Sequence, residues 1–156
     1  MSGAYYAIEQ RLSQRVENTY FAIGTFTPIL IGSGTAGTFT YSLQAGLYTR
    51  IGNIVFVSGH IAISAISVAP TGNMSIGGLP FTAGSSDPGT LNVSDQTGFT
   101  LGASYSQVGA RVTASATTAL LIKSGTAVGA LVLQGSAFAL VGGAAEIVFS
   151  GCYQVA

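Results

Sequence analysis

The spacing of apolar residues changes about 20 residues into the chain. Within the first 17 residues, apolar side chains recur at intervals of three and then four, at Tyr5, Ile8, Leu12 and Val16. This spacing places them on one face of a short helix. A helix of fewer than about 12 to 15 residues is marginal alone in water, so the stripe needs a partner. That partner is the same stripe in sister subunits, a groove on another protein, or the chain's own sheet. We expect residues 1–23 to form an arm for anchoring or oligomerisation.

From residue 26 onward, apolar and polar residues alternate with a period of two. Residues 38–43 alternate apolar and hydroxyl side chains, and the odd positions of residues 55–65 form a continuous apolar face. Such alternation is typical of antiparallel strands with one buried and one wet face. The apolar set moves to even positions after Ala65, which predicts a bulge or bend there. About ten short strands at regular spacing predict an all-β antiparallel β-sandwich or jelly-roll over residues 24–156.

Turn-forming residues divide the remaining apolar runs. Their pattern predicts a strand over each of three ranges, 26–31, 99–103 and 137–141. The glycine pair 142–143 predicts a two-residue hairpin turn. Pro28 has no N–H group to donate to a sheet, so the first of these strands is expected at an edge.

The most polar stretch of the predicted β domain runs from residue 84 to residue 98. It is rich in serine, glycine, aspartate and asparagine, which favour loops. We therefore expect it to form an exposed contact loop that presents Asp87, Asn92 and Asp95. Tyr105, in a following loop, is a fourth candidate for contact with a sugar or a peptide.

Charge is scarce in this chain. Its 156 residues include five lysines and arginines and five aspartates and glutamates, with a formal net charge of zero. No long-range field attracts nucleic acid or an anionic membrane, so we expect no nucleic-acid binding. The most apolar run is shorter than the ~20 residues of a spanning helix, so no membrane insertion is expected. Near-zero charge together with a mean hydropathy of +0.55 favours self-association.

Few residues could perform chemistry. The single histidine, His60, and the single cysteine, Cys152, have no neighbours in sequence that complete a nucleophilic or metal-binding motif. Residues 32–37 match G-x-G-x-x-G, but a strand follows where a dinucleotide site requires a helix and a later acidic residue. We therefore predict no catalytic, cofactor-binding or metal-binding residues, and no cofactor.

Four segments resemble a known family. Residues 25–30 (TFTPIL), 39–41 (FTY), 46–55 (GLYTRIGNIV) and 76–81 (IGGLPF) are similar to a β-rich domain common at the C-termini of bacteriophage tail fibre and tail-associated proteins. In that family the position of Phe26 is usually tryptophan. The resemblance covers the first half of the β domain, and it implies a non-enzymatic virion protein that commonly forms a homotrimer.

Two virion roles follow from this resemblance. The first is a tail fibre or receptor-binding tip, displayed on the virion surface after assembly in the host cytoplasm. The alternative is a capsid decoration protein, and a carbohydrate-binding module or enzyme is a second alternative. In the first role, the partners would be two further copies, other virion proteins bound through the arm, and a host surface glycan or protein.

Overall fold

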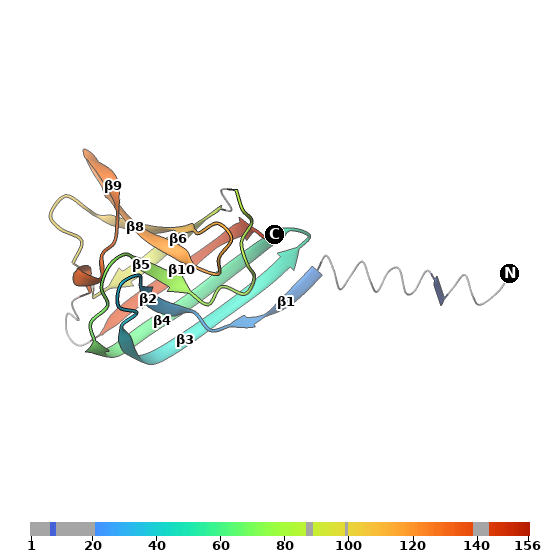
Figure 1. Ribbon diagram of the computed structural model, residues 1–156, viewed down its shortest axis with the longest axis horizontal. Coiled ribbons are helices and arrows are strands. Elements are labelled where there is room, and N and C mark those ends of the chain that lie inside the picture. Colours follow the sequence, from blue (N-terminus) through green and yellow to red (C-terminus); the bar gives the residue numbers. More distant parts are fainter. Residues whose placement is uncertain (1–6, 9–20, 87–88, 99, 139–143) are drawn as a thin grey trace.

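The computed structural model describes residues 7–8, 21–86, 89–98, 100–138 and 144–156 (Figure 1). Most of the regular structure in these ranges is β-strand. The strands are β1 (Phe21–Phe26), β2 (Ile29–Gly32), β3 (Thr38–Ile51), β4 (Ile54–Val68), β5 (Met74–Gly77), β6 (Gly89–Thr97), β7 (Gln107–Val112), β8 (Ala119–Gly125), β9 (Val128–Val132) and β10 (Ala145–Gln154), and η1 (Gly135–Ala137) is a 3-10 turn. No helix within the described ranges is long and apolar enough to cross a membrane.

Hydrogen bonds join the ten strands into one sheet. The strand order is β1-β3-β4-β10-β6-β7-β8-β5-β2, and β9 pairs with β8 off this path. Every pair is antiparallel, which confirms the predicted all-β antiparallel class. The described strands form a single sheet in their hydrogen bonding, whereas a sandwich or jelly-roll was expected to have two.

The two ends of this sheet lie next to each other. β1 and β2 are the first and last strands of the path, yet only Thr27 and Pro28 separate them in the chain. Three Cα steps of about 3.8 Å cover at most about 11 Å, so the sheet must roll until its ends meet. Figure 1 shows β1 running on into β2 beside β3.

Side chains of β3 close the seam between these ends. The Leu30 N–H donates to Tyr41 Oη at 3.0 Å, and Gln44 Nε2 donates to the Pro28 carbonyl at 2.9 Å. Pro28 has no N–H to pair across the seam, which explains why the predicted strand over residues 26–31 is interrupted there. The seam is therefore held by side chain to backbone bonds, with no ladder between β1 and β2 in the described residues.

One hydrophobic core fills the rolled sheet. Residues on both sides of the roll contribute to it, so the inner face is dry although the hydrogen bonds form a single layer. The largest fully buried side chains are those of Tyr153, Phe149, Ile61, Ile63, Met74, Ile76, Leu91, Leu121, Leu133 and Ile147.

Two glycines on adjacent strands make room for two phenylalanine rings. In register across four strands, Phe26 of β1 is opposite Gly46 of β3, which is opposite Gly59 of β4, which is opposite Phe149 of β10. A Cβ at Gly46 would lie 2.6 Å from the Phe26 ring, and a Cβ at Gly59 would also overlap the Phe149 ring. The rings therefore cover the glycine backbone, with their centroids 6.5 Å apart.

The sheet begins slightly earlier than predicted. β1 starts at Phe21, within the segment assigned to the arm. Ile8 is helical and 56% exposed, whereas Tyr5, Leu12 and Val16 lie outside the described residues. The helical arm therefore remains a prediction.

The bulge expected near Ala65 is confirmed. The pairing of β3 with β4 shifts register between Thr40 and Tyr41 and twice more close by, so Ser64 has no partner opposite it. These irregularities bend the long pair of strands at the place where the apolar face changes sides.

The predicted loop over residues 84–98 is wrong for most of its length. Residues 89–97 form β6, which pairs with both β10 and β7. Leu91 is buried and Val93 is half-buried, while Asn92, Ser94 and Asp95 are exposed. The polar residues that suggested an exposed loop are thus the wet face of a strand.

Two further strand predictions differ from the structure. Residues 100–103 are not in a strand, and Ala137 belongs to the 3-10 turn. Residues 139–141 and the glycine pair 142–143 lie outside the described residues, so the hairpin turn remains a prediction.

Two tyrosines make the stability sensitive to alkaline pH. Burial raises the pKa of Tyr41 and of Tyr153 above the ordinary 10.0, against the lowering effect of backbone hydrogen bonds to Leu30 and Phe81 respectively, and of Arg50 on Tyr153. The unfolded chain therefore loses these protons at lower pH than the folded chain. Their contribution to stability is complete below about pH 10 and is lost as the pH rises through the higher folded pKa values.

We accordingly expect the urea midpoint to fall above about pH 10. A Tyr41→Phe, Tyr153→Phe double variant should be less stable at neutral pH, because Phe81 loses both backbone bonds to Tyr153, of 3.2 and 3.0 Å. Its midpoint should nevertheless depend less on alkaline pH. The urea midpoint of each protein is measured at several pH values across this range. If the two midpoints fell equally with rising pH, Tyr41 and Tyr153 would not be the groups responsible.

Candidate functional site

A polar pocket opens where β6 and β7 separate. Their ladder ends at the pair Asn92–Gly109, and beyond it the two strands diverge. On the other side, the pairing of β6 with β10 shifts register so that Ser94 is an extra residue. A bulge of this kind redirects side chains, and pairing with β10 continues beyond it to Thr97. The resulting cavity of about 520 Å³ is lined by Asn92, Val93, Ser94, Asp95, Gln96, Ser106, Gln107, Val108, Gly109 and Ser124.

This pocket contains two of the predicted contact residues. Asn92 and Asp95 line it, and Tyr105 immediately precedes the lining residue Ser106. Asp87 lies outside the described residues. The structure therefore brings Asn92 and Asp95 together, although on a strand and not on a loop.

Lys123 positions Tyr105 next to the pocket. Its Nζ lies 4.3 Å from the centroid of the Tyr105 ring and donates a hydrogen bond of 2.7 Å to the Leu101 carbonyl. A cation against an aromatic face contributes about 0.5–1 kcal/mol at such partly exposed sites. The tyrosine ring is thus in contact with a second residue, which favours its position beside the pocket.

One acceptor in the pocket lacks a partner. Gln96 Oε1 is buried and makes no hydrogen bond within the part of the chain that the structure describes. A buried acceptor without a donor costs about 1–3 kcal/mol. Gln96 lines the pocket, but this oxygen is shielded from solvent and is not presented to a ligand there.

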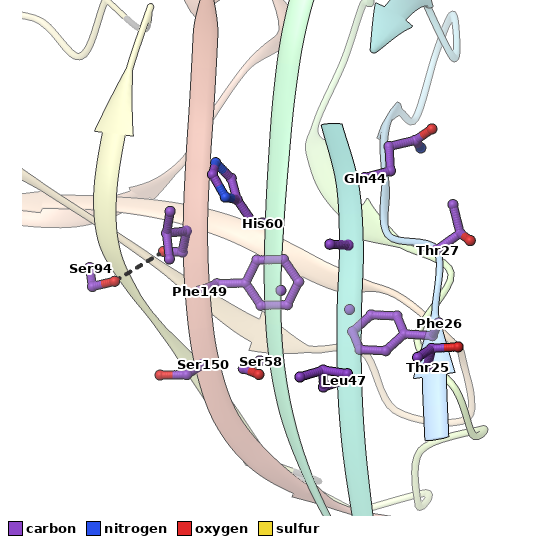
Figure 2. A pocket seen from close by; sticks show the side chains of 14 residues that line it. Thr25, Phe26, Thr27, Gln44, Leu47, Ser58, His60, Ser94, Phe149 and Ser150 are labelled. Carbon is purple, nitrogen blue, oxygen red and sulfur yellow. Dashed lines mark hydrogen bonds between the residues drawn. The ribbon is translucent and has the colours of Figure 1, made fainter. Parts of the chain in front are cut away.

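A second hollow lies on the outer face of the sheet. It has a volume of about 640 Å³ and crosses five strands, from Thr25 of β1 through Leu47 and Ser58 to Ser150 and Ser94. Figure 2 shows these side chains around the row that contains Phe26 and Phe149. Gly46 and Gly59 border this hollow with their backbone only, because the positions that their side chains would occupy face inward, against the rings of Phe26 and Phe149.

One short hydrogen bond between side chains lies at the edge of this hollow. His60 Nε2 and Glu146 Oε1 are 2.5 Å apart, and each side chain is about one third exposed, at 35% and 37%. Ser94 Oγ donates to the Val148 carbonyl at 3.4 Å and not to the histidine. The described residues contain no group of three or more His, Cys, Asp or Glu that could hold a metal ion. This arrangement links β4 to β10 by a side-chain hydrogen bond, but it does not place a nucleophile beside His60.

The outer face also exposes apolar residues that the sequence pattern alone did not single out. Five large apolar side chains on this face are each about half exposed or more, namely Phe21, Ile23, Leu47, Ile51 and Phe56. The signal was present in the sequence, because these strands have large apolar residues at both odd and even positions. A strand with one wet face would have polar residues at every second position.

Comparisons with known proteins bear on the fold. No protein-family model matches the sequence, and no curated protein matches it. Among solved structures, the chain is similar to the crystal structure of the Dettilon tailspike protein, with a TM-score of 0.70 at 20% sequence identity. The match covers 86% of this chain and 24% of the tailspike chain, so this chain spans about a quarter of the length of that protein. The rolled antiparallel sheet is therefore a fold that also occurs as one part of a larger tailspike.

Proposed function

We propose that this chain is a non-enzymatic structural module of a bacteriophage virion, acting as a homotrimeric tail fibre or receptor-binding tip. The observation that carries the proposal is the shared fold with a phage tailspike over 86% of the chain. The sequence resemblance to tail-associated C-terminal domains supports the same role. It rests on short sequence segments, whereas the tailspike match rests on the fold. The scarcity of ionisable groups favours a binding role over a catalytic one.

In this proposal the arm and the polar pocket have different partners. The arm attaches the module to other virion proteins or to its sister arms through its apolar stripe, which consists of Tyr5, Ile8, Leu12 and Val16. The polar pocket around Asn92 and Asp95 contacts the host surface. Amide and hydroxyl side chains bordered by a tyrosine suit a neutral glycan or a polar peptide, because such ligands offer many hydrogen-bonding groups.

The proposal predicts competition between the free protein and the phage that carries this chain. Purified protein added to host cells first should reduce phage adsorption. An Asn92→Ala, Gln107→Ala double variant should lose most of this effect, because it removes two amides from the pocket. Adsorption assays over a range of protein concentrations measure both effects. Gln154→Ala, a change at an exposed residue of β10, is the matched control and should block as well as the unchanged protein.

Other outcomes would identify the alternatives. A capsid decoration protein would leave adsorption unchanged and would alter the thermal stability of the capsid. A carbohydrate-active enzyme would degrade host glycan and lose turnover on His60→Ala. Either result would contradict the proposed role.

A further inference from the structure

The outer sides of β1, β3 and β4 share one uncharged apolar surface. We define the apolar outer face as Phe21, Ile23, Leu47, Ile51 and Phe56. In register, Phe21 is opposite Ile51, and Ile23 is opposite Thr49, which is opposite Phe56. Residues directly opposite one another in antiparallel strands lie on the same face, so these side chains form one patch.

This patch has no charged side chain. Arg50 is the one charged residue in the three strands. It lies at an inward position, where its guanidinium carbon is 5.0 Å from the centroid of the Phe81 ring and its Nε donates to the Gly52 carbonyl. A partner for this face therefore needs an apolar and uncharged surface of its own.

The exposed area corresponds to the core of a stable interface. Exposure of these side chains ranges from 49% at Phe56 to 68% at Ile23. Five side chains of this size, each about half exposed, present roughly 500 Å² of apolar surface. An interface of standard size buries about 800 Å² on each partner, with an apolar centre and a polar rim. Thr25 and Ser58, on either side of Leu47, supply hydroxyl groups for that rim, whereas Thr49 lies within the patch, between Ile23 and Phe56.

We infer that a second copy of this chain covers the apolar outer face, so that this face lies at the axis of the oligomer. The inference rests on the homotrimer of the proposed function and locates its interface. The zero net charge allows copies to approach without repulsion. The first 20 residues also end directly at Phe21, on this face, so an arm bundle would bring the faces of its copies together.

Cys152 provides a built-in measurement of this contact. It is an exposed free thiol on β10, directly opposite Phe56 and therefore on the same side of the sheet. A copy packed over Phe56 would shield the thiol from reagents in solution. In the reduced oligomer we expect Cys152 to be labelled at least about tenfold more slowly than in the denatured chain, which corresponds to about 1.4 kcal/mol of protection.

The test is an Ile23→Thr, Phe56→Thr variant of the full chain. Threonine is β-branched and suits a strand, so folding should survive, which circular dichroism checks. We expect the dissociation constant of the oligomer, measured by light scattering with size-exclusion chromatography, to rise at least about tenfold. If the arms still hold the copies of this variant together, its mass will remain that of the oligomer but Cys152 will become reactive, which would also support the inference. Leu131→Thr, at a residue of β9 that is 53% exposed, is the matched control and should change neither reading.

The outcomes separate this inference from the proposed function. An oligomer whose mass and Cys152 protection both survive the double substitution would overturn the inference and leave the trimer in place. Dissociation caused by Leu131→Thr alone would also overturn the inference, because it would place the contact between copies at β9. An unchanged chain that is monomeric at micromolar concentration would contradict the homotrimer itself, and with it the inference.

Discussion

Replacing Gly59 with alanine is expected to destabilise the fold by about 3 kcal/mol, near the upper end for an added core methyl group. The new Cβ would lie 2.6 Å from Phe149 Cε1, well inside van der Waals contact. Phe149 is only 1% exposed and belongs to the core, so its ring has no open space to enter. Urea denaturation followed by tyrosine fluorescence measures the loss.

A double-mutant cycle tests whether this ring is the cause. Phe149→Ala alone should cost about 3–5 kcal/mol, because it removes a fully buried ring. Combined with Gly59→Ala, the total should be clearly smaller than the sum, since the new methyl group then occupies part of the vacated space. Additive losses would show that the strain at Gly59 arises elsewhere.

Gly129→Ala is the control for this cycle. Gly129 lies in β9, where a Cβ would meet no atom within 4 Å. The substitution should leave stability unchanged or raise it slightly, because alanine has less freedom than glycine in the unfolded chain. If both alanine variants lost equal stability, crowding by Phe149 would not be the explanation.

The all-β class could be predicted from the sequence because it depends on local alternation. The period of two in residues 55–65 and the change of parity near Ala65 both correspond to observed features, β4 and its register shifts. The closure of the sheet could not be predicted this way. It depends on pairing β1 with β3 and β2 with β5, and no local pattern specifies partners so distant in the chain.

The candidate site was predicted in part and for an incomplete reason. The polar composition of residues 84–98 predicts a contact role for Asn92 and Asp95, and both line the pocket. That pocket exists because β6 leaves β7 after Asn92, and strand separation has no signature in composition. Gln96 and Gln107, which complete the lining, resemble ordinary surface residues in the sequence.

The seam should be the second most sensitive place in the fold. Gly78 has a φ of +77°, and a Cβ there would lie 2.5 Å from the carbonyl oxygen of Thr27. Thr27 belongs to the two-residue link between β1 and β2, so the obstructing atom is backbone and cannot rotate away. We expect Gly78→Ala to cost about 3 kcal/mol, of which about 1–2 kcal/mol comes from the left-handed conformation and the rest from the clash.

Gly102→Ala separates these two contributions. Gly102 also has a positive φ, of +92°, but the nearest atom to its Cβ would be a Tyr105 ring carbon at 3.7 Å. This variant should therefore lose only the conformational part, about 1–2 kcal/mol. Thermal and urea unfolding of the two variants in parallel give the difference. Equal losses would mean that the link at Thr27 can shift to admit a methyl group, and that the closed seam is looser than its hydrogen bonds from Tyr41 and Gln44 imply.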